Sequence, residues 1–255
     1  MSWFSRVSAT LLALAATTGV AMAQEGATVR IGTEGAYAPF NFIDSNGELQ
    51  GFDVDIAKAV CEKMKAECTF VAQDWEGIIP ALTSGKYDAI FASMSITDER
   101  KQVIDFSRPY YNSPSAFVTA KDSGLTGSSP SDLSGRTIGA QASTIQAVHL
   151  EENYGDAEHR LYPSQEEVNL DLVSGRIDAL FVDKLVAIDW LASPDGACCE
   201  LVGEDVPIGG GIGAGVRQED TELRDMISAA IDEIKADGTY DAINAKYFDF
   251  SIWID

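Results

Sequence analysis

The residues best suited to chemistry lie in one stretch of the chain, residues 88–111. A predicted buried strand ends there at two small hydroxyl residues, Ser93 and Ser95. Thr97 is followed by three charged residues, a pattern typical of a helix N-cap and first turn. A strand end beside a helix start collects free backbone N–H groups, and Arg100 adds a planar cation that can grip a carboxylate. We therefore predict a carboxylate site, unless Arg100 pairs with a surface aspartate and the serines only turn the chain.

Complementary groups stand at other predicted strand ends. Asp183 closes an apolar strand and suits an ammonium group, while the predicted helix start at Thr144 suits a carboxylate. Tyr37 and Trp75 each follow a strand and could stack on a flat or cationic side chain. Glu34 could pair with the far end of a basic ligand. For the two aromatic residues, core packing is the alternative.

The elements expected to carry these residues alternate between strands and helices. A strand over 28–33 precedes a helix that begins near Gly51, a strand over 68–72, a helix that begins at Trp75, and the strand before Ser93. This alternation predicts a parallel sheet. Ligands of open α/β sheets gather at the carboxyl ends of the strands.

A second alternating run follows, and part of it repeats the first. Residues 174–180 (SGRIDAL) closely match residues 84–90 (SGKYDAI), and in both a helix is predicted to end at glycine before a buried strand begins. The strands of this second run are expected at 137–139, 161–162 and 179–182, and its helices at 144–154, 166–174 and 186–191.

Two such runs predict two lobes with a ligand cleft between them. We expect the chain to cross between the lobes near 112–116 and again near 205–213. The two amphipathic C-terminal helices should pack back onto the first lobe. The predicted division is a signal peptide at 1–23, lobe 1 at 24–112 and 210–255, and lobe 2 at 113–209.

The N-terminus has the pattern of a secretory signal peptide. Arg6 precedes a short apolar run over 7–20, and the small residues Ala21 and Ala23 frame a cleavage site. The run is too short for a transmembrane helix. No cysteine follows the predicted cleavage site, so no lipid anchor is expected there. The mature protein is predicted to be exported and not inserted in the membrane.

The charge of the chain bears on its partners. The formal net charge is −22, and loss of Arg6 with the signal peptide makes it −23. An acidic surface of this size argues against nucleic acid and anionic membranes as partners. It attracts small cations weakly, because salt screens the field. Solubility is the simpler reason for most of these carboxylates.

Four cysteines occur, as one spaced pair and one adjacent pair. In an oxidising compartment, Cys61 and Cys68 could join a helix end to the next strand. Closing so short a loop should stabilise the fold by about 2–3 kcal/mol. For Cys198 and Cys199, a bridge between neighbours, free thiols and an intermolecular link all stay open. The spacings, with His149 and His159, match no usual zinc site, and no metal or other cofactor is predicted.

Signatures of common enzymes are missing from the sequence. It has no G-x-S-x-G elbow, no H-E-x-x-H motif and no P-loop. The glycine-rich residues 209–213 only loosely resemble a dinucleotide-binding loop, and they do not stand between an early strand and a helix. A hinge-side loop is the better interpretation. The pattern favours a binding protein over an enzyme.

Several ordered motifs resemble a known family, the periplasmic polar-amino-acid-binding proteins of ABC importers (solute-binding protein family 3). The resemblance covers essentially the whole mature chain, and is greatest to the lysine/arginine/ornithine-binding type, which shares the spacing of Cys61 and Cys68 and the ending KYFDF at 246–250. The motifs that carry it are YAPF at 37–40, GFDVD at 51–55, IPAL at 79–82, SITDER at 95–100, DFS at 105–107 and DGTY at 237–240.

The resemblance implies a role for each candidate residue. Arg100, Ser95 and Thr144 would bind the ligand carboxylate. Asp183 and Ser93 would bind the α-ammonium group. Tyr37 and Trp75 would enclose the ligand side chain, with Glu34 at its far end. The ligand-binding set implied is Glu34, Tyr37, Trp75, Ala92, Ser93, Met94, Ser95, Arg100, Ser143, Thr144 and Asp183, with a disulfide between Cys61 and Cys68.

Two positions depart from the resemblance. Ala92 stands where close relatives carry serine, and Ile145 where they carry a polar side chain. Both changes remove hydrogen-bonding capacity near the ligand's side-chain end. An acidic residue at Glu34 is not decisive either, because glutamine-binding relatives have one too. The aromatic pair is the better argument for a cationic ligand.

The fold implied is α/β and two-lobed, a periplasmic-binding-protein fold in which each lobe is a mostly parallel sheet flanked by helices and two hinge crossings join the lobes. The predicted function is capture of an L-amino acid, first of all arginine, lysine or ornithine, for a membrane permease of an ABC importer. The protein is expected to be a periplasmic monomer. The alternatives are an opine, histidine or glutamine as ligand, an enzyme resembling cyclohexadienyl dehydratase on the same fold, and a sensory role toward a chemoreceptor.

Overall fold

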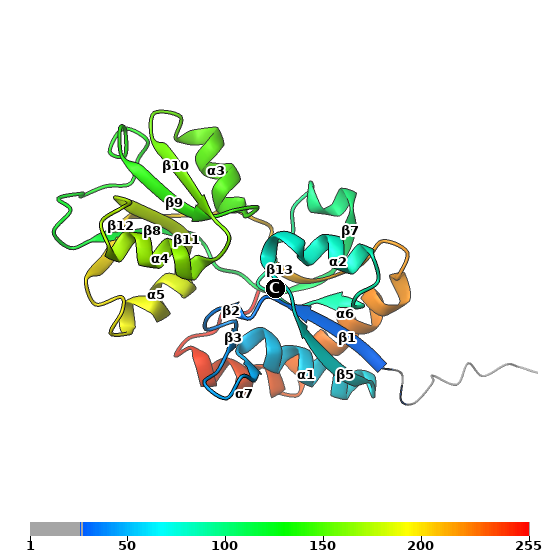
Figure 1. Cartoon of the computed structure of the whole chain (residues 1–255). Helices are drawn as coiled ribbons and strands as arrows, with labels where there is room; N and C mark the ends of the chain where they lie inside the picture. Colours follow the sequence, from blue (N-terminus) through cyan, green and yellow to red (C-terminus); the bar gives the residue numbers. More distant parts are fainter. Residues whose placement is uncertain (1–25, 27, 255) are drawn as a thin grey trace, which may run out of the picture.

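The computed structural model describes residue 26 and residues 28–254, so the predicted signal peptide at 1–23 lies outside the described residues. The described chain forms two lobes side by side (Figure 1). The green and yellow part of the sequence makes one lobe, and the blue, cyan, orange and red parts make the other. Within the part of the chain that the structure describes, no helix is long and apolar enough to cross a bilayer.

The first lobe is built on a five-stranded sheet of order β5-β1-β6-β13-β7. Strand β1 pairs in parallel with β5 and β6, whereas β13 is antiparallel to β6 and to β7. The strands are β1 (Thr28–Thr33), β5 (Glu67–Ala72), β6 (Ala89–Ile90), β7 (Ile104–Tyr111) and β13 (Ile212–Arg217).

Helices cover this first sheet. The C-terminal helices α6 and α7 both contact α1, so the end of the chain packs on its beginning. Helix α1 buries Phe52, Ile56 and Val60 in the core of the lobe. The helices are α1 (Phe52–Met64), α2 (Ile78–Thr83), α6 (Thr221–Ala236) and α7 (Thr239–Tyr247), with 3₁₀ turns η1 (Trp75–Gly77) and η2 (Arg100–Gln102).

A small three-stranded sheet lies between β1 and α1, formed by β2 (Ala36–Tyr37), β3 (Asn41–Ile43) and β4 (Leu49–Gln50). It presents Tyr37 toward the second lobe. Gly51 ends it with φ 122°, and a Cβ there would lie 2.3 Å from the carbonyl oxygen of Phe40. Only glycine fits this close approach, which brings the start of α1 against the loop that follows Tyr37.

The second lobe is built on a sheet of order β10-β9-β11-β8-β12. Strand β9 pairs in parallel with β10 and β11, whereas β8 is antiparallel to β11 and β12. The strands are β8 (Ser115–Ala120), β9 (Thr137–Gln141), β10 (Glu158–Tyr162), β11 (Ala179–Asp183) and β12 (Cys199–Val206), and the helices are α3 (Ile145–Asn153), α4 (Gln165–Val173) and α5 (Lys184–Ala192).

The predicted two-lobed α/β fold is confirmed, with one refinement in each sheet. Half of each sheet is parallel, as the alternating pattern predicts. The antiparallel half consists of the strands that lead into and out of the crossings between lobes, β7 to β8 and β12 to β13. Strands β8 and β13 enter from the other lobe, so no βαβ crossover within one sheet precedes them and they are free to pair antiparallel with the strands β11, β12, β6 and β7.

The repeat noticed in the sequence has a structural counterpart. Asp88 in the first lobe accepts the backbone N–H of Arg30 at 3.0 Å, and Asp178 in the second accepts that of Thr137 at 2.8 Å. Each aspartate also pairs with an arginine, Arg30 and Arg136 respectively. The two aspartates thus have equivalent roles. Asp88 holds the start of β6 against β1, and Asp178 holds the start of β11 against β9.

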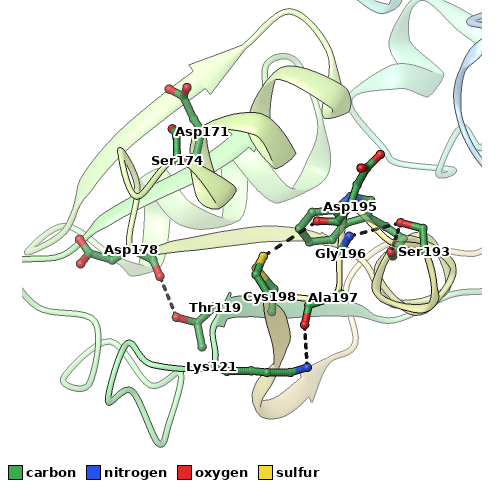
Figure 2. Close-up of a disulfide and its surroundings, with 12 residues drawn as sticks. Thr119, Lys121, Asp171, Ser174, Asp178, Ser193, Asp195, Gly196, Ala197 and Cys198 are labelled. Carbon is green, nitrogen blue, oxygen red and sulfur yellow. Dashed lines mark hydrogen bonds between the residues drawn. A yellow bond between two sulfur atoms is a disulfide. The ribbon is translucent and has the colours of Figure 1, made fainter.

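Both cysteine pairs form disulfides. The bridge between Cys61 and Cys68 joins the last turn of α1 to β5. Cys198 and Cys199, whose state the sequence left open, are joined to each other at the start of β12. Figure 2 shows Cys198 at the end of a tight loop, where Nζ of Lys121 donates to the carbonyl of Ala197 at 2.8 Å. A disulfide between neighbours therefore stands where a strand of the second lobe begins.

The predicted helix after Thr97 is absent, which corrects the sequence analysis. The chain makes only the 3₁₀ turn η2 (Arg100–Gln102) before β7 begins. Thr97 still behaves as a cap, because its Oγ1 accepts the backbone N–H of Arg100 at 3.1 Å. The strand β7 pairs with β13 from Ile104 onward, and this tertiary pairing ends the turn before a helix can propagate.

Candidate functional site

A cavity lies between the two lobes and is lined by residues of both. The first lobe supplies the loop after β1, the ring of Tyr37, the turn η1 and the segment that follows β6. The second lobe supplies the ends of β9 and β11 and the first turn of α3. The lining residues are Glu34, Tyr37, Trp75, Ala92, Ser93, Ser95, Arg100, Gln141, Thr144, Ile145, Gln146 and Asp183.

The geometry follows from the topology. Glu34 follows β1, Gln141 ends β9 and Asp183 ends β11, and these three strands lie in the parallel halves of their sheets. The carboxyl ends of parallel strands meet at one edge of a sheet, where loops converge. Because the two sheets turn these edges toward each other, polar groups from both lobes share one cavity.

Arg100 supplies the positive charge of the cavity. Its Nη1 donates to the carbonyl of Ser95 at 2.8 Å, and its guanidinium carbon lies 5.2 Å from the ring centre of Trp75. Among the described residues it forms no ion pair within 4 Å. Removal of water from around the guanidinium lowers the pKa of Arg100 to about 10, so the group stays charged at neutral pH. It is a fixed cation without a bound counterion.

Asp183 supplies a negative charge from the second lobe. It is 5 % exposed, and its Oδ2 accepts the hydroxyl of Tyr37 at 2.7 Å across the cleft. Its Oδ1 is buried without a hydrogen-bond partner among the described residues. Burial raises the pKa of Asp183 to about 6, although the hydrogen bond from Tyr37, the charge of Arg100 and the nearby side-chain amide of Gln146 oppose this. The amide of Gln146 donates to Ser115 at 2.9 Å and makes no direct hydrogen bond to Asp183. A buried acceptor without a donor is costly, which points to a donor supplied by a ligand.

Glu34 is a second buried carboxylate in the cavity. Its Oε1 accepts the side-chain amide of Gln141 at 2.6 Å, again between the lobes. Burial raises the pKa of Glu34 to about 7, and the hydrogen bond from Gln141 only partly offsets this. No cation of the described chain pairs with it. The cavity therefore holds two acids and one base, an arrangement that would be electrically balanced by a guest with one net positive charge.

Trp75 and Ser143 form a further contact between the lobes. Nε1 of Trp75 donates to the carbonyl of Ser143 at 3.1 Å, and Nη2 of Arg100 lies 3.4 Å from the same oxygen. Ser143 has φ 59°, which is uncommon for a residue other than glycine, and this turns its carbonyl toward the first lobe. Ser143 itself is not among the lining residues of the cavity.

Thr144 starts α3 at the edge of the cavity. Its Oγ1 accepts the N–H of Ala147 at 3.1 Å and donates to the carbonyl of Gln141 at 2.7 Å. The side chain is therefore a helix cap, as the sequence predicts. The first N–H groups of a helix have no partner within the helix, and they carry the positive end of its dipole. A carboxylate between this helix start and Arg100 would be bound from both lobes.

The segment that follows β6 contributes Ala92, Ser93 and Ser95 to the cavity wall. Ser93 has φ 53° and shares a hydrogen bond of 2.6 Å between its Oγ and the hydroxyl of Tyr111. Ser95 forms an isolated antiparallel β-bridge with Ile212, the first residue of β13. Ala92 lines the cavity without a polar group. Met94 is fully buried in the core cluster around Leu82, away from the lining.

Nine of the sequence-predicted site residues line the cavity, and Met94 and Ser143 do not. Their binding roles remain predictions. Sequence reasoning missed Gln141 and Gln146. Gln146 is buried and donates to Ser115 at 2.9 Å. The position of Gln141 at a strand end was the signal for it, the same signal that selected Asp183.

The lining has the chemistry of a binding site. Its described residues include no histidine, cysteine or lysine, and its two carboxyl groups, Glu34 and Asp183, each accept a hydrogen bond from the other lobe. Among the described residues, no group of three His, Cys, Asp or Glu side chains could hold a metal ion. The lining instead offers a base from one lobe, an acid from the other and aromatic faces between them. This set matches a zwitterion with a cationic or flat side chain.

Comparisons with known proteins agree with this geometry. Residues 29–250 match the model of a family described as bacterial extracellular solute-binding proteins, family 3. The chain is 42% identical to an L-arginine-binding protein of Pseudomonas aeruginosa, over 88% of this chain and 89% of that protein. It is 39% identical to a histidine-binding periplasmic protein of Escherichia coli K12, with the same coverage. A solved structure of an ancestral arginine-binding protein bound to arginine superposes with a TM-score of 0.83 at 38% identity, covering 88% of this chain and 99% of that one.

Proposed function

Because this chain belongs to family 3 of the bacterial extracellular solute-binding proteins, we propose that it binds a basic L-amino acid, first of all arginine, between its lobes. The observation that carries this is the pairing of two incompletely satisfied charges across one cavity. Arg100 has no carboxylate partner among the described residues, and Oδ1 of the buried Asp183 has no donor. An α-carboxylate and an α-ammonium group would complete both.

The basic side chain is assigned to the far end of the cavity. Glu34 is buried there beside Gln141, and Trp75 and Tyr37 line the same cavity. A buried carboxylate without a cation favours a ligand that brings one. The acidic net charge of −22 adds a weak long-range attraction for such a ligand. The names of the arginine- and histidine-binding relatives support the same ligand class.

The proposed cellular role is delivery to the permease of an ABC importer. The lobes, 24–112 with 210–255 and 113–209, would move as units about the two crossings and close on the ligand. The proposed location is the periplasm, reached by means of a cleaved signal peptide at 1–23. The proposed mature form is a monomer. The closed form, with both lobes joined, is what a permease would distinguish from the open one.

Calorimetry with a ligand panel tests the ligand assignment. Arginine, lysine, ornithine, histidine, glutamine and an opine would be titrated into protein that has been unfolded and refolded to remove bound ligand. Agmatine, which is arginine without the carboxylate, tests the role of Arg100. The guanidino acid without the α-amino group tests Asp183. We expect arginine to bind and both truncated analogues to bind at least about a hundredfold more weakly.

The outcomes separate the candidates. A tight ligand at about a thousand times its Kd should stabilise the protein by roughly 4 kcal/mol. Preference for histidine or glutamine over every guanidinium ligand would reject the basic-ligand assignment and leave amino-acid binding intact. Turnover of prephenate or arogenate by the purified protein would support the enzyme alternative instead. Failure to bind any of these compounds would overturn the proposed function.

A further inference from the structure

Asp53 is a buried carboxylate that lies behind the cavity wall and does not line the cavity. It is the second residue of α1 and has no exposed surface. Its Oδ2 accepts the backbone N–H of Ser93 at 2.6 Å, and its Oδ1 accepts the hydroxyl of Tyr110 at 2.7 Å. It forms no ion pair with any cation among residues 28–254. Both oxygens are therefore committed to the segment that follows β6 and to β7.

Ser93 is held in a conformation that its own side chain does not favour. Its φ of 53° lies in the left-handed region, where residues with a Cβ are uncommon. Two short hydrogen bonds fix it there, from its N–H to Asp53 and between its Oγ and the hydroxyl of Tyr111 at 2.6 Å. Backbone strain of this kind persists only where the surroundings enforce it.

We propose that Asp53 is a positioning residue for the ligand: its carboxylate holds the N–H of Ser93 and so fixes the cavity wall in its binding conformation. The inference rests on the proposed function, because it assigns Asp53 a role through the site residue Ser93. Asp53 also ties in the loop after Tyr37, since its own backbone N–H donates to the carbonyl of Phe40 at 2.8 Å. Asp53 thus contacts Ser93 through its carboxylate and the loop after Tyr37 through its backbone.

The groups that face Asp53 explain why a carboxylate is needed there. They are Tyr110 and Tyr111 from β7, Tyr240 from α7, Asn41 from β3 and the backbone of Ser93, and none is a cation. Burial raises the pKa of Asp53 to about 7, and the hydrogen bonds from Tyr110 and Ser93 hold it from rising further. An ionised carboxylate accepts from two donors at once with charge-assisted strength. An asparagine offers one oxygen and would leave one donor unpaired.

Asp53→Asn tests the proposal against a matched structural control. Tyr87→Phe also removes a buried hydrogen bond from the first lobe, the one from Tyr87 to the carbonyl of Ile78, but contacts neither Asp53 nor the cavity. Both variants should lower the melting temperature. Only Asp53→Asn should weaken binding of arginine, by about tenfold to a hundredfold, while Tyr87→Phe stays within about twofold of wild type. Equal affinity in Asp53→Asn and wild type would overturn the positioning role.

A second measurement uses the wild-type protein and does not depend on how the variant folds. The carboxyl carbon of Asp53 and the amide proton of Ser93 are followed by NMR as the pH is raised. If the bond is as described, both titrate with one midpoint and the amide proton moves downfield as the acid ionises. Different midpoints would overturn the proposal. Absence of amino-acid binding by the wild type would instead overturn the proposed function, whatever the NMR result.

Discussion

Arg100 and Asp183 lie on opposite walls of the cleft, and their free hydrogen-bonding capacity decides what the site can hold. Within residues 28–254, one oxygen of Asp183 accepts no hydrogen bond, and Arg100 keeps donors that its contacts with Ser95 and Ser143 do not use. Two opposite charges at a fixed separation are suited to orienting a zwitterion.

Arg100→Lys should separate the contribution of the positive charge to ligand affinity from the contribution of the planar guanidinium. Lysine keeps the positive charge but loses the planar fork and the face that stacks on Trp75, so we expect affinity for arginine to fall about a hundredfold. Arg108 provides the control, because its guanidinium carbon also lies over a tryptophan, 4.6 Å from the ring centre of Trp253, outside the cavity lining. Calorimetry on Arg100→Lys and Arg108→Lys checks this. An Arg100→Lys protein that binds as tightly as Arg108→Lys would exclude a bidentate grip.

At the residue level, sequence reasoning succeeded where charge marks a position. Asp183 and Glu34 stood out as acids at strand ends, and Arg100 as the cation after two serines. Gln141 stands at an equivalent strand end, and that position was the available signal, but an uncharged amide does not stand out there as a carboxylate does. The unpaired oxygen of Asp183 and the left-handed backbone of Ser93 follow from tertiary packing, which no single-residue pattern encodes.

Among the elements, α3 and α4 allow a comparison of a cap that lines the cavity with a cap that does not. Thr144 accepts the N–H of Ala147 at 3.1 Å beside the cavity, and Ser164 accepts that of Glu167 at 3.4 Å away from it. Thr144→Ala and Ser164→Ala should each cost about 0.5–2 kcal/mol of stability. Only Thr144→Ala should also weaken ligand binding, by about threefold to tenfold, because it loosens the helix start that faces the carboxylate.

Thermal unfolding and calorimetry on the same two proteins check this comparison. If Thr144→Ala loses stability but binds with wild-type affinity, the helix start does not contribute to the ligand site. If Ser164→Ala weakens binding equally, the effect is a general one of lobe stability and carries no information about the carboxylate.

Element prediction worked where local signals and tertiary structure agree. Strand β1 was expected at 28–33 and is found at Thr28–Thr33, because alternating Val29 and Ile31 also face the core. The start of α3 at Thr144 was likewise predicted, and the structure shows Thr144 as its cap. The helix expected after Thr97 is only a 3₁₀ turn, because the residues from Ile104 onward form β7 and pair with β13. Such pairing joins residues far apart in sequence, and local patterns do not show it.

Across the whole molecule, four side-chain hydrogen bonds among the described residues join the lobes, and in one of them Tyr37 donates to the carboxylate of Asp183. Tyr37→Phe removes the donor to Asp183 and keeps the ring, so the unliganded protein should spend more time open. Small-angle X-ray scattering should then give a larger radius of gyration than wild type, and saturating ligand should restore it. Tyr162→Phe is the control, because Tyr162 donates to Asp171 at 2.7 Å within one lobe. Equal radii for all unliganded proteins would show that this bond does not favour closure.

The buried acids predict opposite pH effects on stability and on binding. In the unliganded protein the pKa of Glu34 is about 7 and that of Asp183 about 6, both raised by burial. Folding therefore favours their protonated forms, and this contribution is lost as pH rises through 6 and 7. A basic ligand needs the ionised forms, so its affinity should fall as pH drops below about 7, by up to about tenfold per pH unit for each group.

Melting curves and calorimetry between about pH 5 and about pH 8 check both signs. We expect the unliganded protein to melt higher at the acidic end and arginine to bind more tightly at the alkaline end. Affinity that stays constant while the carboxyls titrate would mean that neither acid contacts the ligand.

The strand order of the first sheet determines when that sheet can be completed during folding. Strand β13 lies between β6 and β7, although both of these are made long before it, and α6 and α7 follow it in the chain. Residues 115–206 contain every strand of the second sheet and can complete it on their own. In the first sheet, β6 and β7 have no strand between them until β13 (Ile212–Arg217) has been made. A polypeptide exported with its N-terminus first would therefore emerge with residues 28–111 in an incomplete sheet, and residues 212–254, which emerge last, would complete that lobe.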